Sequence, residues 1–349
     1  MNGGTETLRS AGLAVVATGV AITGLVLGSS FLIPLAISIL LWNLLEALIK
    51  MFERVRIGPA HVPRPVAMGL GITVVVLTLY LVVSVLFGQA DDIKEAWPRY
   101  VSRLEAMIGD LSHWLGPIAS EKVSSLLREI NLVRRLPTLL FSAQSFMVSL
   151  LLVVAYVGFL LAEERYLAPK IAAMSHNKGQ AVKMAQLFND ISESIRRYIW
   201  MKTLVSLLTG GVSYGILRAI GVDFAETWAM LIFVLNFIPN IGSIMAVTFP
   251  ALIALVQFDT LTPFFTLVIG LTALQFVVGN VIEPVLMGST LNMSPFAIML
   301  GLAFWGTIWG IVGMFLSVPI LVLLMIVCAH IPSWRWVAVL LSKDGRIVV

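Results

Sequence analysis

The sequence predicts an all-α integral membrane protein with about seven or eight transmembrane segments, some of them interrupted by glycine and proline. Hydrophobic residues make up 59% of the 349 residues and charged residues only 12%, and the mean hydropathy is +0.97. Two stretches carry no charged side chain: Thr227 to Phe258, 32 residues, and Pro284 to Ala329, 46 residues. Since one crossing takes about 20 residues, the longer stretch must form more than one segment.

The N-terminal part reads as three spans. Ser10 to Glu46 is long enough for two helices joined at Gly28-Ser29-Ser30, and Val66 to Phe87 gives 22 uncharged residues for a third. Between them lies a short basic loop, Lys50 to Arg64, which we expect to face the cytoplasm. The N-terminus is then cytoplasmic as well.

The middle of the chain alternates between polar and apolar segments. From Asp91 to Arg135, seven acidic residues balance seven basic ones, and apolar residues recur every three or four positions. This pattern predicts an amphipathic helix from Ile93 to Leu115 and a second one around Val123, lying on the membrane or on neighbouring subunits; a soluble receptor-like domain is the alternative. A fourth span, Leu139 to Ala162, should return inward to another amphipathic helix, with a fifth span from about Ile199 to Ile220.

These observations suggest seven segments. They are residues 1–65, an N-terminal hairpin and basic loop; 66–90, the third span; 91–137, the extracytoplasmic helices; 138–165, the fourth span; 166–198, the cytoplasmic helix; 199–330, a transport core with broken helices; and 331–349, a cytoplasmic tail.

The most informative stretch is Asn236-Phe237-Ile238-Pro239-Asn240-Ile241-Gly242-Ser243, inside the uncharged run. Proline removes a backbone donor and glycine permits unusual dihedral angles, so a plain helix is interrupted there. Backbone that leaves a helix at membrane depth is tolerated where protein or a water-lined cavity satisfies it, as at transporter binding sites. We expect the Asn and Ser oxygens to bind a polar solute or a cation, with Gln275 and Asn280 facing them. Interhelical hydrogen bonding is the simpler alternative. The predicted binding residues are Asn236, Pro239, Asn240, Gly242, Ser243, Gln275, Asn280 and Glu283.

Glu283 is a carboxylate at the end of a span, beside Asn280 and Pro284. An ionisable group at membrane depth is costly, so one interpretation is a protonatable or cation-binding group in a pathway. The other is a residue at the headgroup level, where charge costs little.

A second break is expected within Trp305 to Gly313. Gly242 ahead of Pro250 resembles Gly313 ahead of Pro319, which weakly suggests an internal repeat of two interrupted hairpins. The residues predicted to act in structure or gating are Pro250, Pro284, Gly306, Gly310, Gly313 and Pro319.

Several classes of protein are disfavoured. The single cysteine, Cys328, cannot form an internal disulfide, and the four histidines lack ligand spacing, so neither a metal nor a cofactor is expected. Basic residues flank apolar segments rather than forming a nucleic-acid surface, and a Walker phosphate-binding motif is lacking. The pentapeptide Gly211-Val212-Ser213-Tyr214-Gly215 matches the hydrolase pattern G-x-S-x-G, but it lies in an apolar helix and not at a strand-to-helix elbow. We therefore do not expect an enzyme.

Together, these motifs make the chain resemble the autoinducer-2 exporter family, most of all the branch of the autoinducer-2 exporter. The resemblance covers nearly the whole chain and is strongest from Tyr198 to Pro319. It rests on Tyr198-Ile199-Trp200-Met201-Lys202-Thr203, on Asn236 through Gly242, on Gly279-Asn280-Val281-Ile282-Glu283-Pro284, and on Phe304 through Pro319.

The resemblance implies a multi-pass protein of the bacterial inner membrane, assembled as a homo-oligomer like the pentamers of the family. It also implies partners: membrane lipid together with a small polar solute, sodium or protons. The first hypothesis is export of a signalling molecule such as autoinducer-2, coupled to protons through Glu283. The alternatives are sodium (or lithium)/proton antiport and a non-transporting membrane scaffold.

Overall fold

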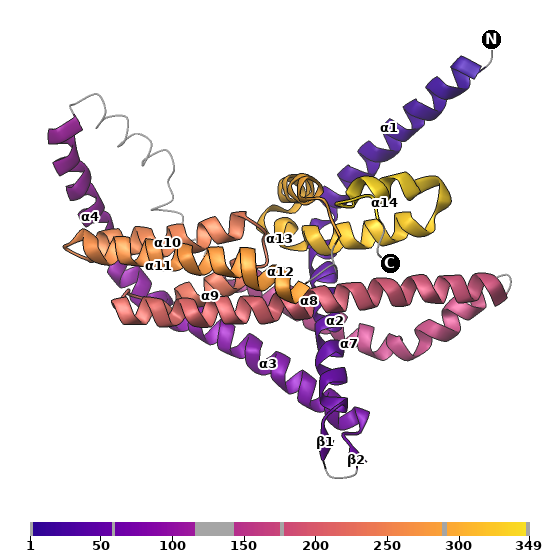
Figure 1. Ribbon diagram of the computed structural model, residues 1–349, viewed down its shortest axis with the longest axis horizontal. Coiled ribbons are helices and arrows are strands. Elements are labelled where there is room, and N and C mark those ends of the chain that lie inside the picture. The colour runs from indigo at the N-terminus through magenta and orange to yellow at the C-terminus, as the bar shows by residue number, and fades with distance from the viewer. Residues whose placement is uncertain (1–2, 58–59, 116–142, 175–177, 288–291, 347–349) are drawn as a thin grey trace. The chain divides into compact units, whose positions relative to one another are not determined.

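The structure, a computed structural model, describes residues 3–57, 60–115, 143–174, 178–287 and 292–346, and these are almost entirely helical (Figure 1). Among the described residues, five helices are long and apolar enough to cross a membrane: Ser29–Glu53, Arg64–Val85, Ala181–Ile220, Leu261–Leu286 and Pro295–His330. Shorter apolar helices accompany them. The predicted fold class, an all-α multi-pass membrane protein, is confirmed.

The chain divides into two compact units. Unit 1 comprises Met1–Leu48, Val148–Trp200 and Ser289–Val349, and unit 2 comprises Ile49–Met147 and Met201–Gly288. The segment 199–330, predicted as one transport core, is thus shared between them.

The N-terminal helices follow the predicted pattern. α1 (Gly3–Leu27) and α2 (Ser29–Glu53) meet at Gly28, as expected. A short hairpin of β1 (Arg56–Ile57) and β2 (Ala60–His61) leads to α3 (Arg64–Gly88), the predicted third span.

Helix α4 (Ala90–Leu115) is the predicted amphipathic helix, and its apolar face buries Ile93 and Ala96. The second amphipathic helix, expected around Val123, lies outside the described residues, as does the start of the fourth span. α7 (Ala143–Met174) carries the rest of that span.

Helix α8 (Lys178–Ile220) runs for 43 residues and contains both the predicted inner-face helix and the fifth span. No proline occurs in it, and Gly179 and Gly210 are separated by thirty residues of helix-compatible sequence. The helix therefore continues through the Tyr198–Ile199 junction, where both side chains are buried.

In unit 2, the uncharged run is broken as predicted. α9 (Ala225–Leu235) ends at Asn236, and α10 (Ile241–Gln257) begins after Asn240; we call residues 225–257 hairpin A. The side chain of Gln257 ties its two ends together: its Nε2 donates to the Gly221 carbonyl (2.8 Å), and its Oε1 accepts from the Asp223 amide (2.8 Å). At about 1.5 Å per residue, α9 is only about 16 Å long, too short to cross about 30 Å of hydrocarbon. The segment therefore folds back on itself.

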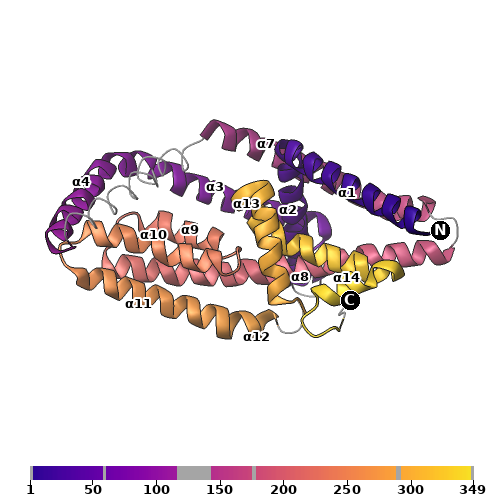
Figure 2. The same cartoon turned by 90° about the horizontal axis from the view of Figure 1, so that it is seen from above.

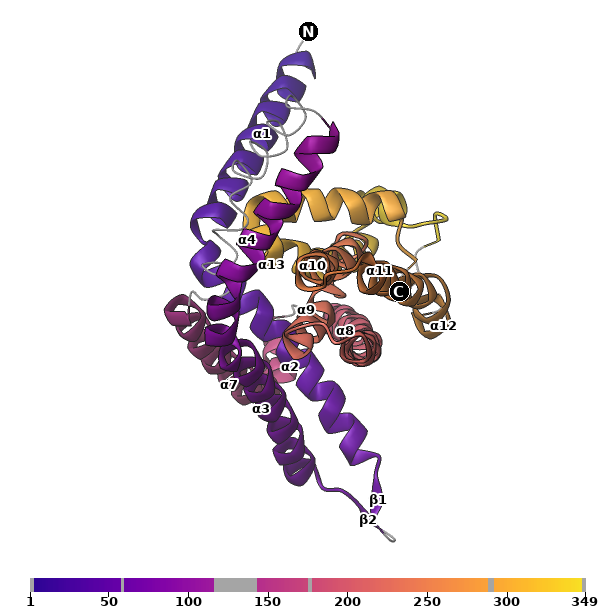
Figure 3. The same ribbon diagram turned by 90° about the vertical axis from the view of Figure 1, so that its left-hand side faces the viewer.

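Helix α11 (Leu261–Val277) lies beside α10, with α8 and α9 close by (Figures 1 and 3). α11 continues through a π-helical turn, η1 (Val278–Ile282), into α12 (Glu283–Met287). Apolar side chains from α8, α9, α10 and α11 form the core of unit 2: Leu217, Ala225, Trp228, Ala229, Ile232, Ala246, Ile253, Ala254, Leu267 and Leu271.

In unit 1, the second predicted break is confirmed. α13 (Pro295–His330) is two helical arms that meet at Gly310 (φ 64°, ψ −143°); we call residues 295–330 hairpin B. The arms pack against each other along their length, because a Cβ at Gly306 would lie 3.0 Å from Met314 and one at Gly301 would lie 2.5 Å from Leu321.

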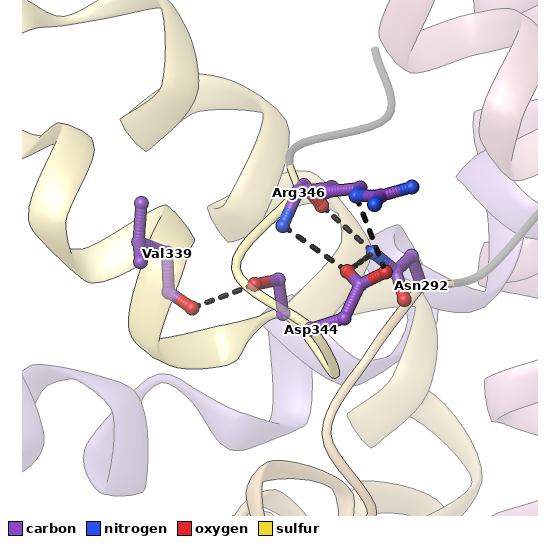
Figure 4. Close-up of polar contacts among 5 residues, drawn as sticks. Asn292, Val339, Asp344 and Arg346 are labelled. Carbon is purple, nitrogen blue, oxygen red and sulfur yellow. Dashed lines mark hydrogen bonds and ion pairs between the residues drawn. The ribbon is translucent and has the colours of Figure 1, made fainter.

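The base of hairpin B is closed by the C-terminal segment. After η2 (Pro332–Trp334), α14 (Arg335–Leu341) lies against α13 (Figure 2). The Ser294 amide donates to the Leu341 carbonyl (2.8 Å), and the Lys343 amide donates to the Asn292 carbonyl (3.0 Å). The Asn292 side chain also donates to the Asp344 carboxylate and to the Arg346 carbonyl (2.8 Å) (Figure 4).

Candidate transport site

The site is built on one face of α8 in unit 2. Four buried polar residues, Lys202, Ser206, Thr209 and Ser213, follow each other at intervals of four, three and four positions. This spacing puts them on one side of a helix. A polar stripe buried in an otherwise apolar segment is costly unless its groups find partners.

Helix α9 packs against this stripe in the opposite direction. Ser206 bonds Asn236, Gly210 lies against Ala229 and Phe233, and Tyr214 bonds Glu226. Along these contacts the residue numbers of α8 rise while those of α9 fall, so the two helices are antiparallel. The Lys202 end of the stripe is therefore level with the tip of hairpin A, and the Ser213 end is level with its base.

At the tip end, Lys202 and Glu283 form an ion pair. Lys202 Nζ lies 2.5 Å from Glu283 Oε1, and the side chains are 4% and 28% exposed. An ammonium this deeply buried is stable only with a counter-charge, and removing one partner of such a pair costs about 3–5 kcal/mol. This contact gives Glu283 a specific partner, because its carboxylate neutralises a buried cation. That role agrees with the interpretation of Glu283 as a group in a pathway.

The π-helical turn η1 directly precedes Glu283. A π-helical turn inserts one extra residue into the α-helical ladder, rotates the residues that follow, and often occurs at functional sites. Here it sets the angle at which Glu283 leaves α11. Asn280 lies within the turn, exposed, and its Nδ2 donates to the Phe276 carbonyl one turn earlier (3.0 Å).

The tip of hairpin A is a tight backbone turn. Asn236 is buried, and its Nδ2 donates to Ser206 Oγ (3.0 Å). Asn240 has a positive φ of 59°, and the Pro239 carbonyl accepts from the Ile241 amide (2.6 Å). A Cβ at Gly242 would lie 1.8 Å from the Leu235 carbonyl oxygen, so only glycine allows the two arms to meet this closely.

The other predicted residues are distributed over both units. In unit 2, Ser243 and Gln275 are half-buried, Pro250 is buried within a continuous α10, and Pro284 is exposed in α12. In unit 1, Gly306, Gly310 and Gly313 shape hairpin B, and Pro319 is buried in its second arm. The structure brings Glu283 to Lys202 and Asn236 to Ser206. Contacts of these residues with a solute stay a prediction.

The base of hairpin A is attached to α4. Tyr100 Oη donates to Asp223 Oδ2 (2.6 Å), and Arg103 pairs with Asp259 (2.5 Å). Burial of the phenol, together with its bond to Asp223, raises the pKa of Tyr100, so the hydroxyl stays protonated and continues to donate. Gln89, between α3 and α4, donates to Glu226 Oε2 (3.0 Å).

An open recess of about 340 Å³ lies beside this junction. It lies at the base of hairpin A, at the opposite end from the Lys202–Glu283 pair. Its lining is largely charged: Asp92, Glu95, Ala96, Arg99, Asp223 and Phe224.

Sequence reasoning missed Lys202 and Ser206 as site residues. The signal was present, because Lys202 is the last charged residue before a nearly uncharged half of the chain and lies four positions before Ser206. The pattern of a lysine followed by Ser, Thr and Ser on one helical face could have identified the stripe.

The family model described as "AI-2E family transporter" matches residues 13–333 of the chain. The chain belongs to the AI-2E transporter family. The AI-2 transport protein TqsA of Escherichia coli (strain K12) is 28% identical over 339 residues, covering 93% of this chain and 92% of the relative. A putative transport protein of Haemophilus influenzae is 28% identical over 337 residues, 95% of each chain. A putative transport protein of Borreliella burgdorferi is 37% identical over 187 residues, 53% of this chain and 51% of the relative.

Membership in the AI-2E family confirms the predicted resemblance and makes this chain a multi-pass membrane protein of a bacterial transporter family. The hydrolase pattern at Ser213 lies within the continuous α8, where that side chain is fully buried and no elbow is formed.

Proposed function

We propose that this protein is a secondary transporter of the bacterial inner membrane that exports a small, neutral, hydroxyl-rich solute such as autoinducer-2. In this proposal, a proton that binds to and leaves Glu283 drives transport. The observation that carries the coupling is the ion pair between Lys202 and Glu283, 2.5 Å apart at the tip end of hairpin A. Support for the solute comes from the name of TqsA, an AI-2 transport protein.

The ammonium of Lys202 is buried and depends on Glu283 for its counter-charge. While Glu283 is ionised, the pair is neutral as a whole and each charge offsets the burial of the other. When Glu283 binds a proton, the ammonium loses its counter-charge in a low-dielectric surrounding. The arrangement with Lys202 buried then becomes unfavourable by several kcal/mol. Protonation of one carboxylate can therefore shift a conformational equilibrium of α8, α12 and the hairpin tip.

The hairpin tip supplies groups suited to a hydroxylated solute. Asn236 and Ser206 are already paired with each other in this conformation, while the Asn240 backbone is strained and its residue is exposed. Strained backbone at a helix break is typical of ligand sites. A solute that exchanges hydrogen bonds with these groups would loosen the contact between α8 and α9.

Sodium/proton antiport is the second candidate, since Glu283 is a suitable oxygen ligand for a cation. In this structure, however, the ammonium of Lys202 occupies the position that a cation would take beside the carboxylate. Sodium would have to displace it, which favours the proton-coupled exporter.

The test uses purified protein in sealed liposomes that contain a pH-sensitive dye. Labelled autoinducer-2, sodium and lithium are supplied in turn to wild type and to Glu283→Gln. We expect autoinducer-2 to cross with movement of protons in wild type, and the coupled flux to be lost in the variant. Asp259→Asn is the matched control, because it makes the same chemical change in an ion pair whose side chains are 42% and 85% exposed.

A double variant separates function from stability. Glu283→Gln alone leaves Lys202 unpaired and should cost about 3–5 kcal/mol of stability. Lys202→Met combined with Glu283→Gln removes both charges, so we expect the melting temperature to recover and coupled transport to stay absent. Sodium-driven proton release that disappears in Glu283→Gln would instead establish antiport, and normal coupled transport in that variant would show that the pair has no role in coupling.

A further inference from the structure

Two buried polar groups at the Ser213 end of the α8 stripe have no hydrogen-bond partner among the described residues. They are Ser213 Oγ on α8, whose residue is 0% exposed, and Trp228 Nε1 on α9, whose residue is 8% exposed. The antiparallel contact of α8 with α9 puts these residues at the same level, between the Gly210–Ala229 contact and the Tyr214–Glu226 bond.

Such groups are unusual in the interior of a protein. A buried donor or acceptor without a partner costs about 1–3 kcal/mol, and most such groups bond to protein or to ordered water. An indole N–H and a hydroxyl at one level supply a donor and a donor-acceptor, which together suit a water molecule. Alanine in place of Ser213 and phenylalanine in place of Trp228 would fill the same positions at a lower cost in free energy. The two polar groups therefore indicate a bound molecule.

Polar groups continue from this level in both directions. Toward the hairpin base, Tyr214 Oη donates to Glu226 Oε1 (3.1 Å), and Glu226 lies in the first turn of α9, next to the recess that Asp223 and Phe224 line. Toward the tip, the stripe passes Thr209 and the Ser206–Asn236 bond. It ends at Lys202 and Glu283. From Lys202 to Tyr214 the helix rises only about 18 Å.

We propose that the contact between α8 and α9 is a proton path, in which water bound at Ser213 and Trp228 links the carboxylate of Glu226 to that of Glu283. The proposal rests on the proton coupling proposed above and names the route that the proton takes. In one passage, the O–H bond of a protonated Glu226 breaks, the water at Ser213 and Trp228 and the hydroxyls of Ser213, Thr209 and Ser206, with further water between them, each accept one proton and release another, and an O–H bond forms on Glu283. Glu226 is left as a carboxylate, Glu283 becomes the neutral acid, and neither an electron nor a further reactant is consumed.

The experiment measures proton flux and solute flux separately in liposomes, for wild type, Ser213→Ala and Trp228→Phe. Both substitutions remove the polar group and keep an apolar side chain of similar or smaller size. We expect coupled proton flux to fall about tenfold in each, which corresponds to about 1.4 kcal/mol in a rate-limiting barrier. Solute binding, measured as the rise in melting temperature with added autoinducer-2, should stay at the wild-type value.

Ser317→Ala is the matched control. Ser317 is also a fully buried serine whose hydroxyl lacks a partner among the described residues, but it lies in hairpin B of unit 1. We expect wild-type proton flux from it. Ser213→Ala should moreover melt close to wild type, because the hydrogen bond that it removes is made to water and not to another part of the protein.

The outcomes distinguish a proton path from a packing role of Ser213 and Trp228, and from a failure of the proposed coupling. Slower proton flux with an unchanged or higher melting temperature supports the path. Wild-type proton flux in Ser213→Ala and Trp228→Phe overturns it and leaves the proposed coupling at Glu283 intact. Lower flux that accompanies a lower melting temperature and weaker solute binding also overturns the path, because it assigns both residues a packing role. Solute flux without proton movement in wild type would overturn the coupling and the path together.

Discussion

Hairpin A and hairpin B both bring two helical arms into close contact at a glycine, but different residues surround their tips. In each, a glycine early in the second arm lies against the end of the first. A Cβ at Gly242 would lie 1.8 Å from the Leu235 carbonyl oxygen, and one at Gly313 would lie 1.9 Å from the Trp305 carbonyl oxygen. A buried proline follows in both second arms, Pro250 and Pro319. The weak internal repeat suggested by the sequence thus corresponds to two similar backbone turns.

The two tips differ in what surrounds them. Hairpin A turns through five residues and bonds its buried Asn236 to Ser206, one helical turn from Lys202. Hairpin B turns at a single residue, Gly310, and its Trp309 Nε1 donates to the Leu25 carbonyl of α1 (3.0 Å). The polar tip is the one that lies next to charged groups. A similar backbone turn can thus carry a polar tip beside charged groups, as in hairpin A, or a tip anchored to a neighbouring helix, as in hairpin B.

Substitutions at the two glycines of close approach should destabilise the protein most, and to a similar degree in both hairpins. Gly242→Ala and Gly313→Ala each place a methyl group inside the contact distance of a carbonyl oxygen, where backbone must move. We expect a loss of at least about 3 kcal/mol and of most folded protein in each case. The measurement is the yield of monodisperse protein in detergent and its melting temperature.

Gly211→Ala is the control for this pair, because a Cβ there meets nothing within 4 Å and the residue lies within α8. It should be neutral or stabilising by up to about 1 kcal/mol. If Gly313→Ala were tolerated and Gly242→Ala were not, the backbone turns of the two hairpins would differ in how closely their arms must approach.

A smaller loss of stability is expected from substitution of Gly310, the residue at which hairpin B turns. Gly310 has space for a Cβ, but its φ of 64° and ψ of −143° fall in a region that is nearly restricted to glycine. Gly310→Ala should therefore cost about 1–3 kcal/mol through backbone strain alone. Melting curves measure this cost, and Gly215→Ala in α8, also without neighbours, provides the reference. A cost equal to that of Gly313→Ala would mean that space, and not backbone conformation, limits this turn.

The contacts that close the base of each hairpin should contribute least to stability, and they differ between hairpin A and hairpin B. In hairpin A, Gln257→Leu removes two neutral hydrogen bonds, so we expect a loss of about 1–2 kcal/mol that is independent of pH. Hydrogen exchange of the Asp223 amide measures it. Gln257→Glu is the control, because it keeps the acceptor for that amide while it replaces the donor to the Gly221 carbonyl with a charged carboxylate oxygen. The amide should stay protected in this variant, and equally fast exchange in both variants would show that the acceptor does not hold the base together.

In hairpin B, the base depends on Asp344. The hydrogen bond from Asn292, and then that from the Arg346 amide, hold the pKa of Asp344 below its ordinary value. A lowered pKa in the folded state means that the stabilisation is present above the ordinary pKa and is lost as the pH falls through the folded value. The protection factors of the Ser294 and Lys343 amides, which correct for the slower intrinsic exchange in acid, should therefore fall as the pH falls, and Asn292→Ala should remove that dependence. Protection factors that do not change in acid would show that backbone bonds alone close this base.

The class of the protein, its helix-rich spans and the positions of both breaks follow from the amino-acid sequence alone. Uncharged runs longer than one crossing must fold back or cross twice, and Asn236 to Gly242 and Gly310 carry the residues that permit a break. Those signals are local, so they can be read from neighbouring residues. The family followed from the same motifs.

The pairing of these segments is seen only in the folded structure. Lys202 and Glu283 are 81 positions apart, and Ser206 and Asn236 are 30 apart. Gln257 reaches the start of its own hairpin, and this contact holds the uncharged segment folded back instead of crossing. Local hydropathy and propensity carry no information about which helix faces which, because packing of α8 against α9 depends on contacts between residues distant in sequence. The charge that makes Glu283 a coupling candidate was therefore visible in the sequence, and its partner was not.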